Sequence, residues 1–335
     1  MTVIQIALGG ITRLTGSGLS ITEWDVITGS LPPLNEQQWL AEFNKYRQTP
    51  QYHLLNFDFT VSDFKFIFFW EWFHRLWART IGLVFLLGFV WFIIKKHFKK
   101  EMINPLLILF LLGALQGAIG WIMVASGLTG DAIYVKPTKL ALHFVFALGL
   151  LSYTFWFALQ LLVKKEQVVR SSSLRKWNLC ILCLLIIQLL YGALMAGHKA
   201  APAASTWPTI NGEWIPEKLF TEKPLSINFI DNTILIHFIH RGLAYLLFVL
   251  IVIWTVKLFR VKGSVLFEKT KWIPLAVVML QLVLGIVTVL TSTGIVPGHW
   301  GVFEWMAQLH QLTGMLLLLS LVWILFIVRR NAKAV

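Results

Sequence analysis

The sequence is poor in charged residues and in cysteine. Charged residues make up 13% of the 335-residue chain, and it contains 2 cysteines. A soluble domain carries about 25% charged residues, so the low charge argues against a soluble globular protein. Cys180 and Cys183 lie inside a long apolar run, and we interpret them as small buried residues. The polar segments between apolar runs contain no cysteine, which excludes disulfides among them.

Acidic residues are also scarce. The chain has 16 Asp and Glu against 29 Lys and Arg, a net charge of +13. The basic residues gather in alternate connections between apolar runs, at 95–100, 164–176 and 257–271, and in the tail. The positive-inside rule places these segments and both termini on the cytoplasmic or matrix side of a membrane. Because this explains the excess charge, we do not expect a nucleic acid as a partner.

Long apolar runs make up most of the sequence. The mean hydropathy is +0.71, and a membrane-spanning helix needs about 20 mainly apolar residues. The runs predict helices at 66–94, 103–124, 138–163, 177–196, 233–256, 272–291 and 304–328. Met1–Gly10 is about half a span and lacks the basic start and cleavage site of a signal peptide. We expect it to belong to a first helix that is cut short, which gives eight helices.

Two polar connections are longer than the others. Residues 11–65 are too long for a plain connection, so we predict a functional cover there, with a surface helix at 35–45. Residues 197–232 are rich in Ala, Pro and Thr. Both connections are expected on the outer side of the membrane.

An internal repeat runs through the chain. Alternate apolar runs carry a Gln-x-x-x-Gly pattern, and the runs between them carry one histidine each near the outer end; the patterns are Gln5–Gly9, Gln116–Gly120, Gln188–Gly192 and Gln281–Gly285, and the histidines are His74, His143, His240 and His310. Three pairs have nearly equal offsets: 166 positions from His74 to His240, 165 from Gln116 to Gln281 and 167 from His143 to His310. The sequence therefore predicts an all-α polytopic membrane protein, an eight-helix bundle built as two pseudo-repeated four-helix bundles in residues 1–165 and 176–330.

The four histidines suit haem ligation. Ionisable residues inside a membrane are costly and mark functional sites. Two helices of one bundle, each with an inward histidine at the same depth, supply the two axial ligands of a haem iron. Zinc needs three or four converging ligands, whereas the spacing offers pairs, namely His74 with His143 and His240 with His310.

Glu71 distinguishes the two halves. It lies three residues before His74, whereas the second half has His237 at the matching position. A carboxylate beside a metal-ligand site can handle protons; the alternative is an ion pair with Arg75 or Arg79. For His237 a hydrogen-bonding role and a supporting role beside the ligand both stay open. Arg75, Arg79 and Arg241 are candidates for binding haem propionates.

The sequence resembles the haem A synthase family over nearly its whole length. The resemblance rests on these segments: Gly9–Ser20, Glu23-Trp24, Ile27–Pro33, Phe64–Phe68, Glu71-Trp-x-His74-Arg75 with Arg79, Lys136–His143, His237-Phe-x-His240-Arg241 and Gln308-x-His310-Gln311. It is closest to the branch of mitochondria and many Gram-negative bacteria, which lacks cysteine pairs in the outer loops. One departure is Ala78, where the family commonly has glycine.

The resemblance implies a specific reaction. Such enzymes oxidise the C8 methyl group of haem O to a formyl group through a hydroxymethyl intermediate, for cytochrome oxidase biogenesis. By analogy, His240 and His310 hold a resident haem b, and substrate haem O lies near His74 and His143. Glu71 and His74 would be catalytic.

The resemblance also implies partners and a location. The expected partners are a haem O synthase, a ferredoxin-like or quinol electron donor, the cytochrome oxidase assembly system and further copies of the chain. The expected location is the bacterial inner membrane, or the mitochondrial one. Two other functions stay open on the residues alone: a di-haem b electron-transfer protein without methyl chemistry, and a transporter built from repeats.

Overall fold

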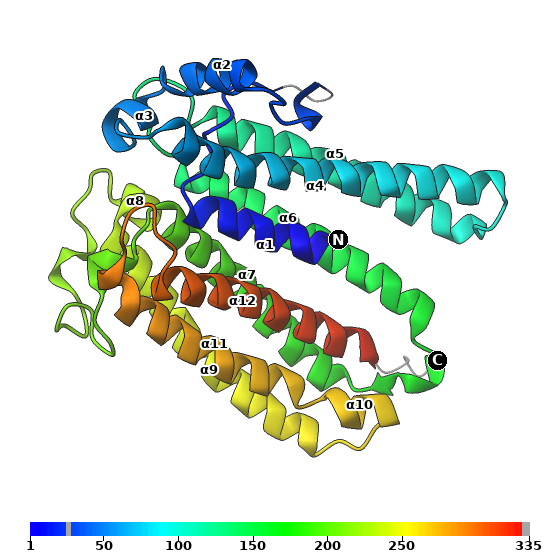
Figure 1. Ribbon diagram of the computed structural model, residues 1–335. Coiled ribbons are helices and arrows are strands. Elements are labelled where there is room, and N and C mark those ends of the chain that lie inside the picture. Colours follow the sequence, from blue (N-terminus) through cyan, green and yellow to red (C-terminus); the bar gives the residue numbers. More distant parts are fainter. Residues whose placement is uncertain (25–27, 330–335) are drawn as a thin grey trace. The chain divides into compact units, whose positions relative to one another are not determined.

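The computed structural model describes residues 1–24 and 28–329, and that part of the chain is almost entirely helical (Figure 1). Among the described residues, seven helices are long and apolar enough to cross a membrane. They are α4 (Val61–Ile94), α5 (Lys100–Ala125), α6 (Pro137–Leu162), α7 (Ser172–Gly197), α9 (Thr233–Phe259), α11 (Ile273–Thr291) and α12 (Val302–Ile327). A shorter apolar helix, α1 (Thr2–Leu14), precedes them. The predicted all-α, polytopic membrane fold is confirmed.

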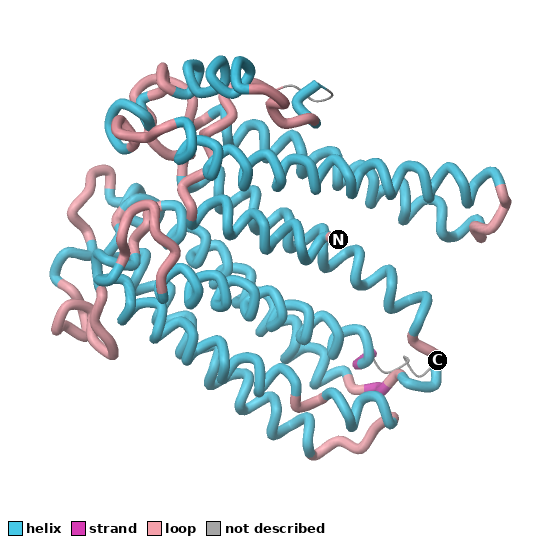
Figure 2. Tube along the Cα trace, viewed as in Figure 1, coloured by secondary structure: helices cyan, strands magenta, loops and turns pink. Residues whose placement is uncertain are grey.

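Strand structure in the described residues is limited to one short pair. Strand β1 (Val169–Arg170) pairs in parallel with β2 (Val328–Arg329), as Figure 2 shows. Each strand has two residues, so the pair does not form a sheet layer. It joins the segment that precedes α7 to the end of α12.

The seven predicted spans match the observed helices to within five residues at every end. The two largest differences have the same cause. Helix α4 begins at Val61 because Thr60 and Asp63 form a reciprocal capping box. Helix α7 begins at Ser172 because the Ser171 hydroxyl accepts a hydrogen bond from the Leu174 amide at 3.3 Å. These polar caps lie outside the apolar runs from which the spans were predicted.

The chain forms two compact units. Unit 1 comprises residues 1–150 with 296–300, and unit 2 comprises residues 151–295 and those from 301 onward. Within unit 2, α7 packs against α9, α9 against α11, α11 against α12 and α12 against α7, which closes a four-helix bundle. Within unit 1, α4 packs against both α1 and α5. The division into domains at 1–165 and 176–330 stays a prediction, since the units meet inside α6.

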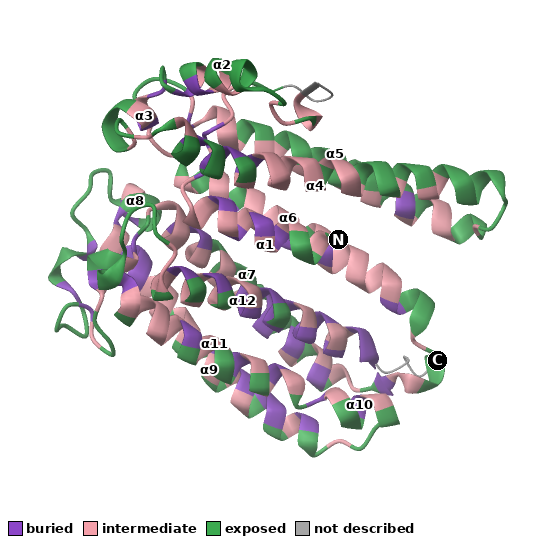
Figure 3. Cartoon of the chain, in the orientation of Figure 1, coloured by how far each residue is buried: buried purple, intermediate pink, exposed green. Residues whose placement is uncertain are grey.

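The bundles expose much apolar surface, as lipid-facing helices do. Helix α12 is largely buried, whereas α4 and α5 are mostly exposed or half-buried (Figure 3). Cys180 and Cys183 lie on an exposed face of α7, so the prediction that they are buried is wrong. Their spacing places them on one face of the helix, and that face points away from the bundle.

The described residues of the first long connection, 11–24 and 28–65, form short helical elements. The connection contains η1 (Thr28–Ser30), the predicted surface helix as α2 (Glu36–Tyr46), and α3 (Pro50–Leu55). The buried cluster Phe43, Tyr46, Phe64, Ile67 and Phe68 packs α2 onto the first turns of α4. The Tyr46 hydroxyl donates to Gln51 at 3.0 Å and accepts from Asn56 at 2.7 Å. Burial raises the pKa of Tyr46 to about 12.

The second long connection contains several short helices. They are η3 (Ala201–Ala204), η4 (Glu217–Leu219), η5 (Leu225–Ile227) and α8 (Asn228–Asp231). At the opposite end of the bundle, α10 (Val265–Thr270) precedes α11. Helix η6 (Ser292–Gly294) follows α11 and packs against η3. The outer connections thus carry short helical elements that reach the ends of the histidine-bearing helices.

Candidate functional site

Each of the four predicted ligand histidines packs against a neighbouring helix at a glycine. The contacts pair α4 with α1, α6 with α5, α9 with α7 and α12 with α11. A Cβ atom built on the glycine would approach the Cε1 atom of the histidine closely: 3.1 Å for Gly9 and His74, 2.8 Å for Gly120 and His143, 3.2 Å for Gly192 and His240, and 2.9 Å for Gly285 and His310. The glycine of every repeat therefore makes room for one imidazole.

The glutamine of every repeat contacts the same imidazole. Its amide nitrogen lies within hydrogen-bonding distance of the ring: 3.2 Å from Nε2 for Gln5 and His74, 3.1 Å from Nδ1 for Gln116 and His143, and 3.4 Å from Nε2 for Gln188 with His240 and for Gln281 with His310. The sequence repeat predicted that these residues belong together. It did not predict that the glutamine touches the imidazole, although the shared Gln-x-x-x-Gly spacing was a signal that the residues serve one purpose.

The two histidines of unit 2 face each other with the spacing of axial haem ligands. The ring centres of His240 and His310 are 6.4 Å apart, and the ring planes are inclined at 77°. Two metal–imidazole bonds of about 2.0 Å, each with roughly 1.1 Å from nitrogen to ring centre, separate two axial rings by about 6.2 Å. These residues fit a bis-histidine haem.

The hydrogen bonds of His310 also suit ligation. Its Nδ1 lies 3.1 Å from the main-chain carbonyl oxygen of Gln281. A carbonyl accepts only, so Nδ1 carries the proton and Nε2 keeps its lone pair for a metal. In the described residues no three His, Cys, Asp or Glu side chains converge, so the zinc site considered above is not formed there.

His74 and His143 form the corresponding pair in unit 1. They come from α4 and α6, and both belong to unit 1. Gln5 and Gln116 hold them more extensively than their counterparts in unit 2 do. Each amide also donates to the main-chain carbonyl of its histidine, at 3.2 Å for Gln5 and 3.1 Å for Gln116.

Glu71 lies one helical turn before His74 and is almost fully buried, with 2% of its surface exposed. One carboxylate oxygen accepts from Arg75 Nη2 at 2.6 Å. The other accepts from the Ser20 hydroxyl at 2.7 Å and from the Ile21 amide at 2.9 Å. The ion pair with Arg75 considered above is thus present, and the same carboxylate fastens the outer connection to α4.

His237 makes the corresponding connection in unit 2. It is fully buried, and its Nε2 donates to the Ala200 carbonyl at 2.7 Å. Its Nδ1 accepts from Arg241 at 3.3 Å. One donating and one accepting nitrogen is the pattern of a neutral imidazole. Of the two roles left open for His237, the structure shows the hydrogen-bonding one.

The arginines that follow the histidines bind carbonyl groups of the outer connections. Arg75 donates to Ile21 and Glu23 at 3.2 and 3.1 Å and lies over the ring of Trp24. Arg241 donates to the carbonyls of Ala204, Thr206 and Thr209 at 2.6 to 3.1 Å. Propionate binding by Arg75, Arg79 and Arg241 stays a prediction.

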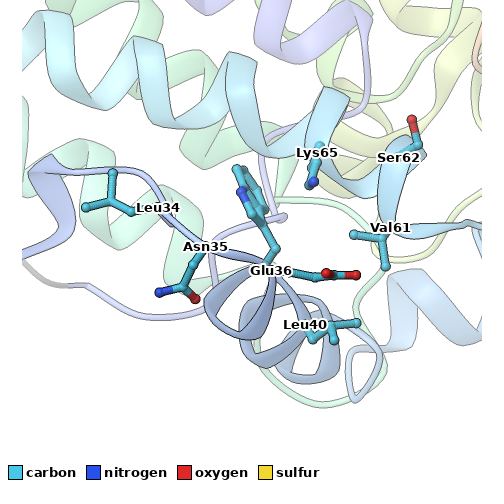
Figure 4. A pocket seen from close by; sticks show the side chains of 8 residues that line it. Leu34, Asn35, Glu36, Leu40, Val61, Ser62 and Lys65 are labelled. Atoms are coloured by element: carbon cyan, nitrogen blue, oxygen red, sulfur yellow. The ribbon is translucent and has the colours of Figure 1, made fainter.

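An open cavity of about 500 Å³ lies elsewhere in unit 1 (Figure 4). It is formed by α2 and the start of α4, and its lining is Leu34, Asn35, Glu36, Trp39, Leu40, Val61, Ser62 and Lys65. The Lys65 ammonium lies 5.2 Å from the centre of the Trp39 ring. None of the predicted site residues lines this cavity.

Known proteins match this chain over most of its length. Residues 1–322 match the family described as COX15-CtaA, cytochrome oxidase assembly protein. A heme A synthase of Novosphingobium aromaticivorans is 41% identical, over 96% of this chain and 90% of its own. Those of Bradyrhizobium diazoefficiens and Rhodospirillum centenum are 42% and 41% identical, over 87% and 98% of this chain and 81% and 86% of their own.

Proposed function

The chain belongs to the COX15-CtaA family of cytochrome oxidase assembly proteins, and from that premise we propose how it works as a haem A synthase. It is an oxidoreductase that acts on a haem methyl group, as the sequence predicts. A di-haem electron carrier without methyl chemistry is not favoured. The finer proposal is that haem O is the substrate and that its C8 methyl group becomes a formyl group through a hydroxymethyl stage.

The resident haem b belongs to unit 2 in this proposal, with His240 and His310 as its axial ligands. The 6.4 Å separation of the two ring centres is the observation that carries this assignment. A haem held by two imidazoles passes single electrons. The protein's part is to fix both rings at the outer ends of α9 and α12; the proton on Nδ1 of His310 leaves Nε2 as the nitrogen that would hold the iron.

Substrate haem O belongs to unit 1 in this proposal, between His74 and His143. Glu71 and His74 are the proposed catalytic residues. Arg75, Ser20 and Ile21 hold the Glu71 carboxylate within one turn of His74. A fixed negative charge there stabilises positive charge that develops as the methyl group is oxidised, and the Ser20 hydroxyl gives the carboxylate a neighbour for proton exchange.

Location and partners follow from the same premise. The chain is a multi-pass membrane protein with a role in cytochrome oxidase assembly. We place it in the bacterial inner membrane with both termini cytoplasmic, because the positive-inside rule puts the basic connections and the basic tail on the cytoplasmic side. A haem O synthase would supply the substrate and a ferredoxin-like or quinol donor the electrons. We also propose self-association, and no nucleic-acid partner.

The test is co-expression with a haem O synthase, followed by extraction and chromatography of haems. The wild type should yield haem A and Glu71→Ala should not. The exposed carboxylate Glu36 lies outside the proposed site, so Glu36→Ala is the control and should match the wild type. Absence of haem A with the wild type would overturn the proposed function. Full haem A with Glu71→Ala would remove only Glu71 from the mechanism.

The division of labour needs separate variants. His240→Ala should lose the resident haem b during purification, whereas His74→Ala should retain it and lose haem A formation. Loss of resident haem b with His74→Ala alone would reverse the assignment of the two units.

A further inference from the structure

We propose that each Gln-x-x-x-Gly segment is a positioning device for one axial histidine, in which glycine sets the approach of the imidazole and glutamine sets its orientation. The proposal rests on the function above, because it takes His240 and His310 as ligands of the resident haem. The residues concerned are not ligands themselves. They act through the histidines that they touch, once in each of the four pairs of helices.

The glycines act by leaving space. At Gly285 a Cβ atom would lie 2.9 Å from Cε1 of His310, whereas ordinary contact begins at 3.4 Å. Any larger residue would push the imidazole away by about 0.5 Å, the tolerance within which a working site must be held. The same argument holds at Gly120, where the distance to His143 would be 2.8 Å. Each glycine is thus fitted to its histidine.

The missing side chain also exposes a carbonyl group. Helical Cβ atoms point toward the helix N-terminus, so a side chain at position 285 would cover the carbonyl of residue 281, one turn earlier. His310 Nδ1 uses that carbonyl, at 3.1 Å. For Gly285 the four-residue spacing therefore has a reason: the glycine uncovers the carbonyl of Gln281, which precedes it by one helical turn. That carbonyl selects the tautomer whose Nε2 can bind iron.

The glutamines act through their amide groups. In the described residues the Oε1 atoms of Gln5, Gln116, Gln188 and Gln281 are all buried without a hydrogen-bond partner, while the amide nitrogens lie at the imidazoles. Burying an unpaired amide oxygen is unfavourable. Since all four repeats bear this cost beside a histidine, contact with the ring is the common purpose of the residue. At His310 the amide nitrogen lies at Nε2, the ring nitrogen that keeps its lone pair, so the amide donates there and holds the ring in this orientation.

The first experiment substitutes the glycine and follows the resident haem. We expect purified Gly285→Ala to lose the low-spin absorption and electron paramagnetic resonance signals of a bis-histidine haem, and added imidazole to restore them. The control is Gly242→Ala in α9, since a Cβ there meets no atom within 4 Å and the change in helix propensity is the same. Low-spin signals in Gly285→Ala equal to those of Gly242→Ala would overturn the role of the glycine.

Misfolding is a separate outcome, and imidazole distinguishes it. If Gly285→Ala only unfolded unit 2, added imidazole would not restore a low-spin haem, and the positioning role would be rejected. A wild type that carries no low-spin haem would instead refute the resident-haem assignment. Thus failure of the further inference and failure of the proposed function give different results.

The second experiment substitutes the glutamine. Gln281→Met keeps the length of the side chain and removes the amide. We expect haem affinity to fall about 10-fold to 100-fold, as for other residues that orient a metal ligand, with a shifted midpoint potential and altered resonance positions. Gln281→Glu also removes the amide donor at Nε2 and should weaken haem binding as Gln281→Met does. A Met variant with wild-type potential and resonances would show that Gln281 only fills space.

Discussion

The hydroxyl of Ser20 is predicted to be needed for haem A formation although it belongs to the outer connection. It donates to Glu71 at 2.7 Å, and both residues are buried. Ser20→Ala leaves the Arg75 and Ile21 bonds. Besides the bond to Glu71 it removes a long contact of the hydroxyl with the Ile67 carbonyl at 3.4 Å. A hydrogen bond to a charged group contributes about 1.5–3 kcal/mol, so if all of it orients the carboxylate in the transition state, the rate falls about 10-fold to 160-fold.

The assay is haem A formation per purified protein, with resident haem b measured in the same samples. Haem b should be unchanged, because its proposed ligands belong to unit 2. Ser17→Ala is the matched control: Ser17 is fully buried in the same connection, but its hydroxyl bonds to Thr15 at 2.6 Å. Wild-type haem A formation in Ser20→Ala, together with its loss in Glu71→Ala, would refute the idea that this bond orients the carboxylate.

Two further predictions concern the outer connections. Arg241→Ala should speed proteolytic cleavage within residues 201–213, because three carbonyl groups there lose their donor; cleavage at the wild-type rate would show that other contacts hold the segment. For Tyr46, whose pKa rises to about 12 in the fold from an ordinary value of 10.0, the stabilisation is present below pH 10 and is lost as pH rises toward 12. The thermal unfolding temperature of the wild type in detergent should therefore fall more steeply with pH above pH 10 than that of Tyr46→Phe. Equal slopes for the two proteins would contradict this.

The spans and the repeat could be predicted because they depend on local composition. Apolar runs give the helices to within five residues, since the bilayer requires the same length of each span. Polar caps shift α4 and α7, and these depend on single hydroxyl groups. The burial of Cys180 and Cys183 was mispredicted for another reason: their spacing defines a shared face but not where that face points.

The site could be predicted only in part. The repeat identified which histidines correspond, because a duplication preserves spacing. It could not show that Gln281 and Gly285 both touch His310, since sequence spacing carries no information about atoms on a partner helix. Nor could it show that Arg241 binds carbonyls more than 30 positions away, because any residue presents a carbonyl there.

The two units share one local arrangement beside a histidine and differ in its charge. In both, the residue three positions before a ligand histidine joins with the arginine one position after it to hold an outer connection: Glu71 with Arg75, and His237 with Arg241. We call each of these residue pairs a clamp. What distinguishes unit 1 is that its clamp ends in a carboxylate, bound by Ser20 and Ile21. Glu71 both holds the connection in place and puts a negative charge beside the proposed substrate. His237 holds its connection in the same way but carries one donating and one accepting nitrogen, so it adds no negative charge in unit 2.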